Sequence, residues 1–482
     1  MIVFPKAPIG SAPVRPAPPA AEPAHRRLAR SALTGRSAFG DLLAFHRWFA
    51  EVADQARFEV HPIPLDDLDG WRTDPETGNI GHRSGRFFTV EGLDVEVVGA
   101  AVPRWQQPII VQPEVGILGL LVADFDGVLH VLVQAKFEPG NVGGLQLSPT
   151  VQATRSNFTA VHGGRAVPYL EHFREAPAQN VLADVLQSEQ GAWFYRKRNR
   201  NMVVEVSPDL EVAEGFRWLT MGQLHRLLAL DGLVNMDTRT VLSCLPTAGA
   251  DPGPIVGCGA DPYSRALRAS FDPASGAAGT LPELLSWVTA IRATVEVSAQ
   301  TMPLAQVEGW VRRGGLITHQ SGRFFDVVGV DVRAGGREVG GWQQPLLRPA
   351  GTGVAAFLVR EIEGVLHVLV QARVEPGFVD VIELAPTVQA TPGNHTGSRP
   401  AFLHEVLNAP PDRIRFDTLL PEEGGRFDHA LTRYLLVEAT GADIDLPRHR
   451  WMAAHQLVGL LHHSHYLNVE ARTLIACLYS TF

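Results

Sequence analysis

The segment GVLHVLVQAKFEPG at residues 127–140 recurs as GVLHVLVQARVEPG at residues 364–377, 237 positions later and identical at 12 of 14 residues. Three shorter segments repeat with the same offset: SGRFF at 84–88 and 321–325, WQQP at 105–108 and 342–345, and PTVQAT at 149–154 and 386–391. A repeat of this length is typical of a duplicated globular unit, because solenoid repeats span only about 20–50 residues.

The duplication divides the 482-residue chain into two units, at residues 38–245 and 280–482. Residues 1–37 contain seven prolines among alanines and arginines, a composition that predicts a disordered tail. Residues 246–279 are rich in Gly, Pro and Ala, and we interpret them as a linker.

Each unit contains apolar runs that predict a β-hairpin. In the first unit the runs 117–122 and 128–133 flank Asp126-Gly127, a turn pair, and Glu363-Gly364 takes that place in the second unit. Because the runs are continuous rather than alternating, we expect helices to cover both faces of the sheet. Helix-like apolar spacing occurs at 42–58, 168–187, 219–231 and 281–295. The sequence therefore predicts an α+β fold with a strongly bent sheet.

Composition narrows the classes of partner. There are 42 Lys and Arg against 51 Asp and Glu, so the net charge is −9, which argues against nucleic acid as a partner. Three cysteines without C-x-x-C spacing predict neither a disulfide framework nor a structural zinc site. No apolar run approaches a membrane span and no signal-peptide core is present, so we expect a soluble cytoplasmic protein that does not bind a membrane.

Polar residues that survive the duplication are candidates for function. Unpartnered buried glutamine costs about 1–3 kcal/mol, so each repeated glutamine requires either a ligand or an internal hydrogen-bond network. Glu138, just after the hairpin, either lines a site or caps backbone amides in a turn. The repeated glutamines are Gln106, Gln107, Gln134 and Gln152, with their counterparts Gln343, Gln344, Gln371 and Gln389.

The segments WQQP, QAKFEPG, SPTVQATRSN and SEQGAWFYRKRNRNM, together with the duplicated layout, closely resemble the NDP-hexose 2,3-dehydratases of deoxysugar biosynthesis. The resemblance covers nearly the whole chain after residue 38. It implies a homodimer whose subunit contains two tandem, duplicated Nudix-like domains. It also implies dTDP-4-keto-6-deoxyglucose as substrate and two nucleotide-sugar pockets per subunit, of which one is catalytic.

The implied reaction suits a chain without a redox or metal motif. A ketone at C4 acidifies the C3 proton, and the resulting enolate expels the C2 hydroxyl, so that a base, oxyanion donors and a proton source suffice. We therefore expect no cofactor. The chain also lacks the acidic helix that binds magnesium in Nudix pyrophosphohydrolases, and we expect no metal site.

The two halves differ at several of these positions. Lys136 corresponds to Arg373, and Tyr169 corresponds to Phe402. Lysine can be tuned to act as a base, whereas arginine stays protonated. We therefore expect the first half to contain the working pocket and the second half a binding remnant, with neutral divergence of the second half as the alternative.

The resemblance and the repeat together give candidate site residues. The acid/base candidates are Lys136, Glu138, His82 and Tyr169. The substrate-binding candidates are Trp71, Gln134, Gln152, Thr154, Arg155, Ser156, Asn157, Phe158, Ser188, Arg198 and Arg200. The second-pocket candidates are Trp310, Gln371, Arg373, Gln389 and Thr391. For the two tryptophans the alternative is a core role, and for the basic run around Arg198 it is a solvated helix face.

Three functions remain open from the sequence. The first is a lyase that removes water from a dTDP-linked 4-keto sugar and passes its product to a downstream 3-ketoreductase. The second is a non-catalytic nucleotide-sugar-binding protein on the same scaffold, and the third is a divergent pyrophosphohydrolase.

Overall fold

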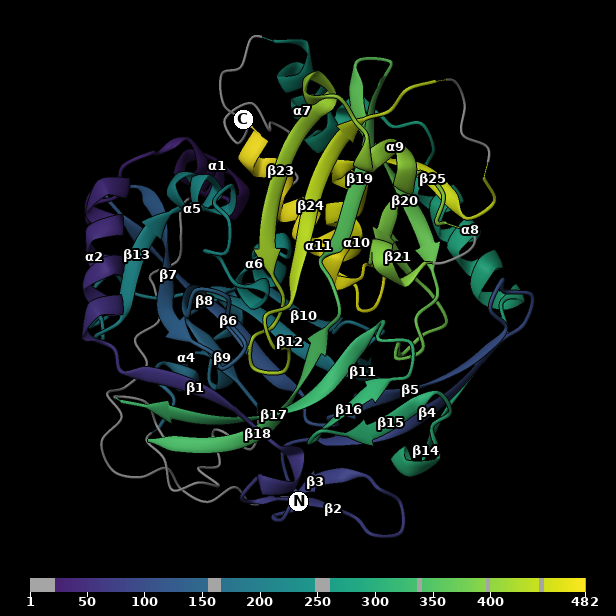
Figure 1. Ribbon diagram of the computed structural model, residues 1–482. Helices are drawn as coiled ribbons and strands as arrows, with labels where there is room; N and C mark the ends of the chain where they lie inside the picture. Colours follow the sequence, from purple (N-terminus) through teal and green to yellow (C-terminus); the bar gives the residue numbers. More distant parts are fainter. Residues whose placement is uncertain are drawn as a thin grey trace.

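The computed structural model describes residues 22–154, 166–247, 261–335, 340–395, 399–441 and 446–481. Within these ranges the chain forms a mixed α+β fold with four β-sheets, two large and two small (Figure 1). None of the described helices is both long enough and apolar enough to cross a bilayer. The predicted α+β class is confirmed.

Each repeat builds one large mixed sheet around the predicted hairpin. In the first repeat the order is β10-β12-β6-β7-β13, with β8 and β9 attached to β7 and β6, and β12 runs parallel to β6. The second repeat has the equivalent order β23-β24-β19-β20, with β21, β22 and β25 attached. The strands are β6 (Gly116–Phe125), β7 (Val128–Phe137), β8 (Leu145–Pro149), β9 (Val151–Ala153), β10 (Val181–Ser188), β12 (Arg198–Glu205), β13 (Phe216–Thr220), β19 (Gly353–Ile362), β20 (Val365–Arg373), β21 (Glu383–Pro386), β22 (Val388–Ala390), β23 (Ile414–Pro421), β24 (Leu431–Glu438) and β25 (His449–Ala453).

The hairpin turns are Asp126-Gly127 and Glu363-Gly364, as predicted. All four residues have φ between 51° and 81°, the positive values that a two-residue type I′ turn requires. Successive residues of β6 enter separate cores, since Leu120 packs on one face of the sheet and Leu121 on the other. The prediction that both faces are covered is therefore confirmed.

Three of the four predicted helical windows contain a helix of similar length: α2 (Leu42–Gln55), α5 (Met221–Leu228) and α8 (Leu281–Thr294). The window 168–187 does not. Only α4 (Leu170–Arg174) is helical there, and β10 begins at Val181. Pro177 disfavours continuation of the helix, and the following segment pairs with β12 instead.

The expectation of disorder over residues 1–37 and of a linker over 246–279 is wrong for part of each segment. Residues 24–33 form α1 (Ala24–Leu33), which packs on β7 and α5, and residues 262–271 form its counterpart α7 (Pro262–Phe271) on β20. The basic composition of α1 was misleading because Arg27 is buried in an ion pair with Glu205, at 2.6 Å. Residues 1–21 and 248–260 lie outside the described ranges.

The two small sheets exchange a strand between the repeats. Strand β1 (Phe58–Ile63) of the first repeat pairs with β17 of the second, and β14 (Val297–Met302) of the second pairs with β4 of the first. Figure 1 shows β1 beside β17 and β18. The repeats are therefore interlocked. The other strands are β2 (Trp71–Thr73), β3 (Ile80–His82), β4 (Thr89–Val97), β5 (Arg104–Val111), β11 (Phe194–Tyr195), β15 (Trp310–Arg313), β16 (Leu316–His319), β17 (Phe325–Ala334) and β18 (Gly341–Pro349).

Two central helices, α6 (Met236–Ser243) and α11 (Val469–Leu478), pack against each other where the large sheets meet. Arg239 of α6 donates to Pro421 O in the second repeat at 2.6 Å and to Val234 O at 2.5 Å. Arg472 of α11 donates to Ser188 O in the first repeat at 2.6 Å. Both arginines are at most 1% exposed, so these reciprocal bonds are shielded from water.

The repeated WQQP glutamines form internal hydrogen bonds, the first of each pair to the other repeat and the second within its own repeat. Gln106 and Gln343 accept hydrogen bonds from the backbone N–H groups of Glu308 and Asp69. Gln107 Nε2 donates to Ala192 O and Gln344 Nε2 to Gly425 O, both at 2.7 Å. For these four glutamines, the internal network explains why both copies of the motif are kept.

Replacing Arg239 by Met should lower the free energy of unfolding by roughly 3 kcal/mol, because two buried carbonyls lose their donor at about 1–3 kcal/mol each. Urea-induced unfolding measures the change. Arg433→Met is the control, since it removes only an exposed ion pair with Asp417, worth less than about 1 kcal/mol. Equal midpoints for the two variants would contradict this role of Arg239.

Candidate functional site

The structure places Lys136 and Glu138 together at the end of β7. Lys136 Nζ lies 2.7 Å from Glu138 Oε1, and their side chains are 14% and 12% exposed. Both candidates therefore form one mostly buried ion pair where strand β7 of the large sheet ends. Shielding from water strengthens such a pair relative to one on the surface.

A loop of the second repeat crosses over the Lys136–Glu138 pair. Gly140 N donates to Gly424 O at 2.7 Å, and His429 N donates to Gly140 O at 2.9 Å. The two backbones lie so close that a Cβ on Gly140 would stand 1.7 Å from Phe427 O, so only glycine fits at this position. The equivalent bonds, Gly377 N to Gly191 O and Arg196 N to Gly377 O, are both 2.8 Å long, so each repeat covers the other.

The crossing loop brings Glu423 and Arg426 to the first-repeat pair. A Cβ built on Gly425 would lie 2.4 Å from Glu423 Oε1 and 3.1 Å from Glu138 Oε2, so the two carboxyl groups converge on this glycine. Burial raises the pKa of Glu423, Arg426 opposes the shift, and Glu138 adds to it.

Helix α6 supplies a further buried carboxyl group, Asp237. Burial raises its pKa well above the ordinary value, and the negative charges of Glu189 and Glu423 raise it further. Asn235 caps the N-terminus of this helix, because its side-chain Oδ1 accepts from Thr238 N at 2.9 Å. Asp237 Oδ1 is buried and has no hydrogen-bond partner among the described residues.

Glu189 and Lys197 complete the group. Burial is the largest cause for both, raising the pKa of Glu189 to about 7 and lowering that of Lys197 to about 8. Lys197 Nζ donates to Asn199 Oδ1 at 2.8 Å, and Asn199 in turn donates to Glu189. We call Lys136, Glu138, Glu189, Lys197, Asp237, Glu423 and Arg426 the first cluster.

Sequence reasoning missed five members of the first cluster: Glu189, Lys197, Asp237, Glu423 and Arg426. Lys197 has Ala430 as its counterpart and Glu423 has Gln190, so a signal was present in the differences between the halves. It pointed to the wrong half for Glu423, because the loop crosses to the other repeat.

The equivalent group in the second repeat is linked by hydrogen bonds of its own. Arg373 Nε donates to Glu375 Oε1 at 2.8 Å, and Gln389 Nε2 donates to the same oxygen at 3.0 Å. Asn468 Nδ2 donates to Gln389 Oε1 at 2.7 Å. In the first repeat, the corresponding Gln152 Oε1 accepts from Ser148 Oγ at 2.8 Å and from Asn235 Nδ2, the counterpart of Asn468, at 3.4 Å. The negative charges of Glu375 and Glu422 raise the pKa of the buried Glu470, with burial as the largest cause. We call Arg373, Glu375, Gln389, Glu422 and Glu470 the second cluster.

Gln146 of β8 lies opposite Lys136 of β7 in the strand register. It is 1% exposed, and neither of its amide atoms has a partner among the described residues. Its counterpart Glu383 accepts from Ser188 Oγ at 2.6 Å. At the position of Ser188 the second repeat has Pro421, which carries no side-chain donor. Ser188, a candidate for the first pocket, thus contacts the second repeat.

Trp71 and Trp310 lie in the small sheets and bond across the repeats. Trp71 is 9% exposed and packs 4.7 Å from the Phe88 ring, and its Nε1 donates to Gln343 O at 2.7 Å. Trp310 Nε1 donates to Gln106 O at 3.2 Å. These contacts fit the core role that the sequence left as the alternative to stacking on substrate.

His82 and Tyr169 have contacts outside the first cluster in the described part of the chain. His82 Nδ1 lies 2.7 Å from Ser84 Oγ, and its ring packs on Trp71. The Tyr169 hydroxyl donates to Glu211 O at 2.9 Å, and burial raises its pKa. No contact described for either side chain joins it to Lys136.

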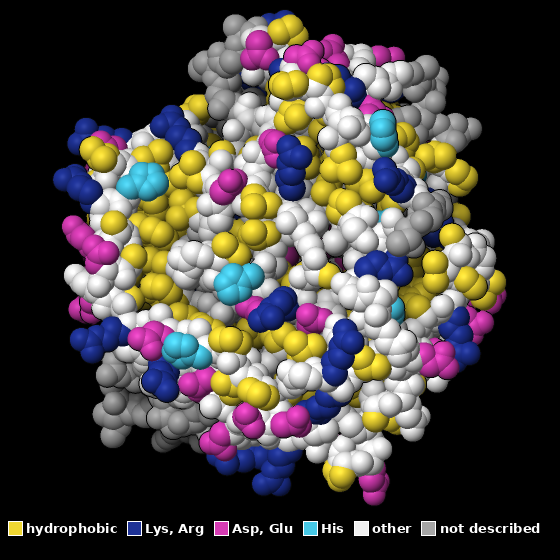
Figure 2. All heavy atoms as spheres, in the orientation of Figure 1, with side chains coloured by type: hydrophobic (Ala, Val, Ile, Leu, Met, Phe, Trp, Pro, Cys, Tyr) yellow, Lys and Arg dark blue, Asp and Glu magenta, His cyan; other side chains and the backbone are white. Residues whose placement is uncertain are grey.

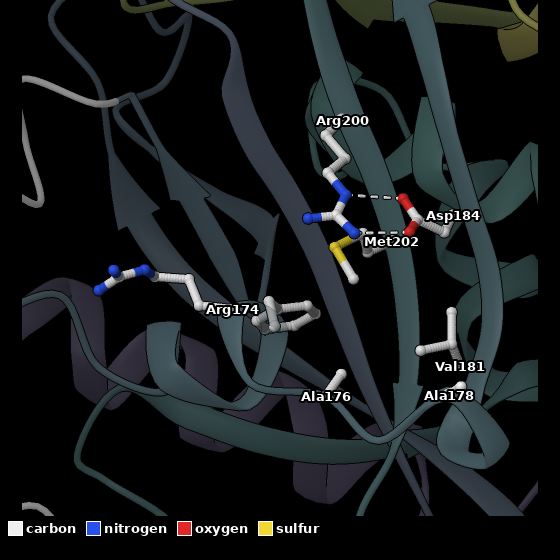
Figure 3. A pocket seen from close by; sticks show the side chains of 8 residues that line it. Arg174, Ala176, Ala178, Val181, Asp184, Arg200 and Met202 are labelled. Atoms are coloured by element: carbon white, nitrogen blue, oxygen red, sulfur yellow. Dashed lines mark hydrogen bonds and ion pairs between the residues drawn. The ribbon is translucent and has the colours of Figure 1, made fainter. Parts of the chain in front are cut away.

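The basic run after β11 forms strand β12, not a helix face, because it pairs with β10 and β6. Arg198 is exposed there. Arg200 binds Asp184 with both guanidinium nitrogens, at 2.7 and 2.6 Å. Figure 3 shows this pair at a hollow lined by residues of α4, β10 and β12. Its volume is about 410 Å³, and none of the residues that line it belongs to the first cluster.

The other candidates are placed as follows. Gln134 lies opposite Ser148 in the β7–β8 register, and Gln371 lies opposite Ala385. Thr154 follows β9, and Thr391 precedes a short 3₁₀ helix, Pro392–Asn394. Arg155, Ser156, Asn157 and Phe158 lie outside the described residues.

Replacing Glu383 by Gln tests whether this buried carboxyl group is protonated in the folded protein. The quantity measured is the free energy of unfolding as a function of pH. Burial raises the pKa of Glu383 to about 8 from 4.5. The folded state therefore holds a proton that the unfolded state loses, and stability falls as the pH rises from 4.5 to 8. Because glutamine does not titrate, the free energy of unfolding of Glu383→Gln should rise relative to that of the wild type by roughly 4 kcal/mol across this range.

Urea denaturation at several pH values measures this difference. Asp417→Asn is the control, because its carboxylate is exposed in an ion pair, so its difference from the wild type should stay nearly constant above pH 5. A Glu383→Gln difference that does not change with pH would show that Glu383 is ionised in the folded protein.

Comparison with known proteins gives a consistent result. The family model for NDP-hexose 2,3-dehydratase matches residues 43–245 and 281–478. A dTDP-4-dehydro-6-deoxy-α-D-glucopyranose 2,3-dehydratase of Saccharopolyspora spinosa is 46% identical over 461 residues, 94% of this chain and 95% of its own. Enzymes of the same name from Amycolatopsis orientalis and Streptomyces violaceoruber are 48% and 47% identical, over 89% and 91% of this chain and 88% and 97% of theirs. The chain therefore belongs to the NDP-hexose 2,3-dehydratase family.

Proposed function

We propose that this chain is a hydro-lyase that removes water across C2 and C3 of dTDP-4-keto-6-deoxyglucose. The product is a dTDP-linked 3,4-diketo-2,6-dideoxy sugar for deoxysugar biosynthesis. The names of three relatives at 46–48% identity support the substrate. The observation that carries the mechanism is the Lys136–Glu138 ion pair, at 2.7 Å, inside a largely buried cluster.

The pair supplies the two groups that the first step needs. Glu138, ionised against Lys136, accepts the proton from C3, and the electrons of the C3–H bond pass to the C4 oxygen. The Lys136 ammonium stabilises the enolate that results. The C2–O bond then breaks, and the enol at C3 tautomerises to the ketone by gaining a proton at C2. The atoms lost make one water, so the step needs no hydride acceptor.

The second cluster is less suited to this chemistry. Glu375 Oε1 is bound by both Arg373 and Gln389, so the lone pairs of this one oxygen are engaged in the fold. Arg373 also donates to Gln389 O at 3.2 Å. We therefore place the chemical step in the first repeat and assign the second cluster to binding or support.

The finer points of the family resemblance are part of the same proposal. We regard each repeat as Nudix-like, which is compatible with a mixed sheet that has one parallel pair and apolar cores on both faces. A homodimer and a cytoplasmic location are also proposed, the latter in keeping with the free thiols of Cys244 and Cys477.

A downstream 3-ketoreductase is proposed because the reactive 3,4-diketone must be reduced before transfer. The acidic net charge argues against a nucleic acid as partner. Figure 2 shows Lys and Arg side chains interspersed with Asp and Glu on the visible face, without a continuous basic stripe.

Substituting Lys136 by Met or Glu138 by Gln should each lower turnover at least about 100-fold, the usual value of a positioned acid–base group. The assay follows 2,6-dideoxy sugar formed with a 3-ketoreductase and NADPH. The matched variants in the second repeat, Arg373→Met and Glu375→Gln, should not show this 100-fold loss of turnover.

The outcomes separate the three candidate functions. Formation of the 2,6-dideoxy product supports the lyase, and release of sugar phosphate supports a pyrophosphohydrolase. Binding of an unchanged sugar supports the non-catalytic alternative. Full activity of both first-repeat variants would remove the ion pair from the mechanism.

A further inference from the structure

The first cluster is completed by the second repeat. Glu423 is placed by three backbone contacts of its loop: Gly424 O with Gly140 N, His429 N with Gly140 O, and Gly425 O with Gln344 Nε2. Glu423 Oε1 accepts from Gly425 N at 3.0 Å. Its Oε2 is buried and has no hydrogen-bond partner in the described ranges.

The corresponding position in the other cluster cannot supply a proton. Gln190 is the counterpart of Glu423, and its Nε2 donates to Glu422 Oε2 at 2.9 Å. An amide does not act as a general acid near neutral pH. The exchange of loops therefore gives an additional carboxyl group to the Lys136–Glu138 pair and an amide to the Arg373–Glu375 pair.

Two further side chains point to a ligand at the first cluster. Residues opposite each other in antiparallel strands share a face of the sheet, so Gln146 lies on the same face as Lys136. Gln146 is 1% exposed and Asp237 2% exposed, and each has a buried polar atom without a partner in the described chain. Polar atoms buried in this way normally have partners, and substrate hydroxyls would provide them.

We propose that Glu423, carried across from the second repeat, is the general acid that protonates the departing C2 hydroxyl in the first-repeat site. The inference rests on the proposed function. The Glu423 O–H bond breaks as its proton joins the C2 oxygen, the C2–O electron pair leaves with that oxygen, and water departs. Glu423 is left as a carboxylate beside Arg426 and Lys136.

The geometry allows Glu138 and Glu423 to carry out different proton transfers. Glu138 and Glu423 meet at Gly425, and they belong to different segments, so one can take the C3 proton while the other serves the adjacent C2 oxygen. Lys136 Nζ lies 2.7 Å from Glu138 Oε1, so the ammonium group is placed beside the carboxyl group that would take the C3 proton. Burial favours the protonated form of Glu423 and raises its pKa.

The test uses two substrates that differ only in their leaving group. Glu423→Gln should lower elimination from the 2-hydroxy substrate at least about 100-fold. With the 2-fluoro analogue, dTDP-2-fluoro-4-keto-2,6-dideoxyglucose, fluoride leaves without full protonation, so fluoride release should stay within about fivefold of wild type. Glu138→Gln should lower both reactions, because each begins with loss of the C3 proton.

Glu423→Asp is a second variant that keeps an acid but withdraws it by one methylene group. It should show an intermediate loss with the same dependence on the leaving group. The control for effects of substitution alone is Glu405→Gln. Glu405 lies on helix α9 (Leu403–Leu407) and pairs with Arg413, and it is not part of either cluster, so both rates should stay unchanged.

The outcomes distinguish this inference from the proposed function. Equal losses on both substrates in Glu423→Gln and Glu423→Asp, or no loss on either, would overturn the role of Glu423. If the wild-type protein forms no elimination product from either substrate, the proposed function fails instead. A loss confined to the hydroxyl substrate supports the proposal.

Discussion

The architecture depends on the reciprocal burial of Arg239 and Arg472. Each guanidinium donates to a carbonyl of its own repeat and to a carbonyl of the other, Pro421 O or Ser188 O. Those carbonyls end β23 and β10, from which the crossing loops begin. A buried carbonyl without a donor is costly, so the two arginines fix where each loop leaves its own sheet.

From that constraint follows the composite nature of the sites. A loop that starts at Pro421 passes over Gly140, and its counterpart starting at Ser188 passes over Gly377. The exchanged strands β1 and β14 also join the two repeats, because each pairs with a strand of the other repeat. The repeats therefore fold as one unit, and each cluster of charges contains side chains from both.

The sequence predicted what short-range patterns encode. The turn at Asp126-Gly127 and the doubly covered strands followed from residue type and apolar spacing, and Lys136 and Glu138 were found because they adjoin that hairpin. Strand exchange was not predictable, because the pattern of β1 does not specify which sheet it joins. Helix α1 was missed because its stabilisation comes from a long-range partner, Glu205, and not from local composition.

The same limit explains why Glu423 escaped notice. Comparing the halves position by position assigns each difference to the repeat that carries it, so Glu423 against Gln190 first reads as a feature of the second half. Once the loops cross, a substitution in one repeat alters the site of the other. Functional asymmetry in this duplicated chain therefore has to be judged crosswise: the first site owes Lys136 to its own hairpin and Glu423 to its partner repeat, and the second site has Arg373 and Gln190 in those places.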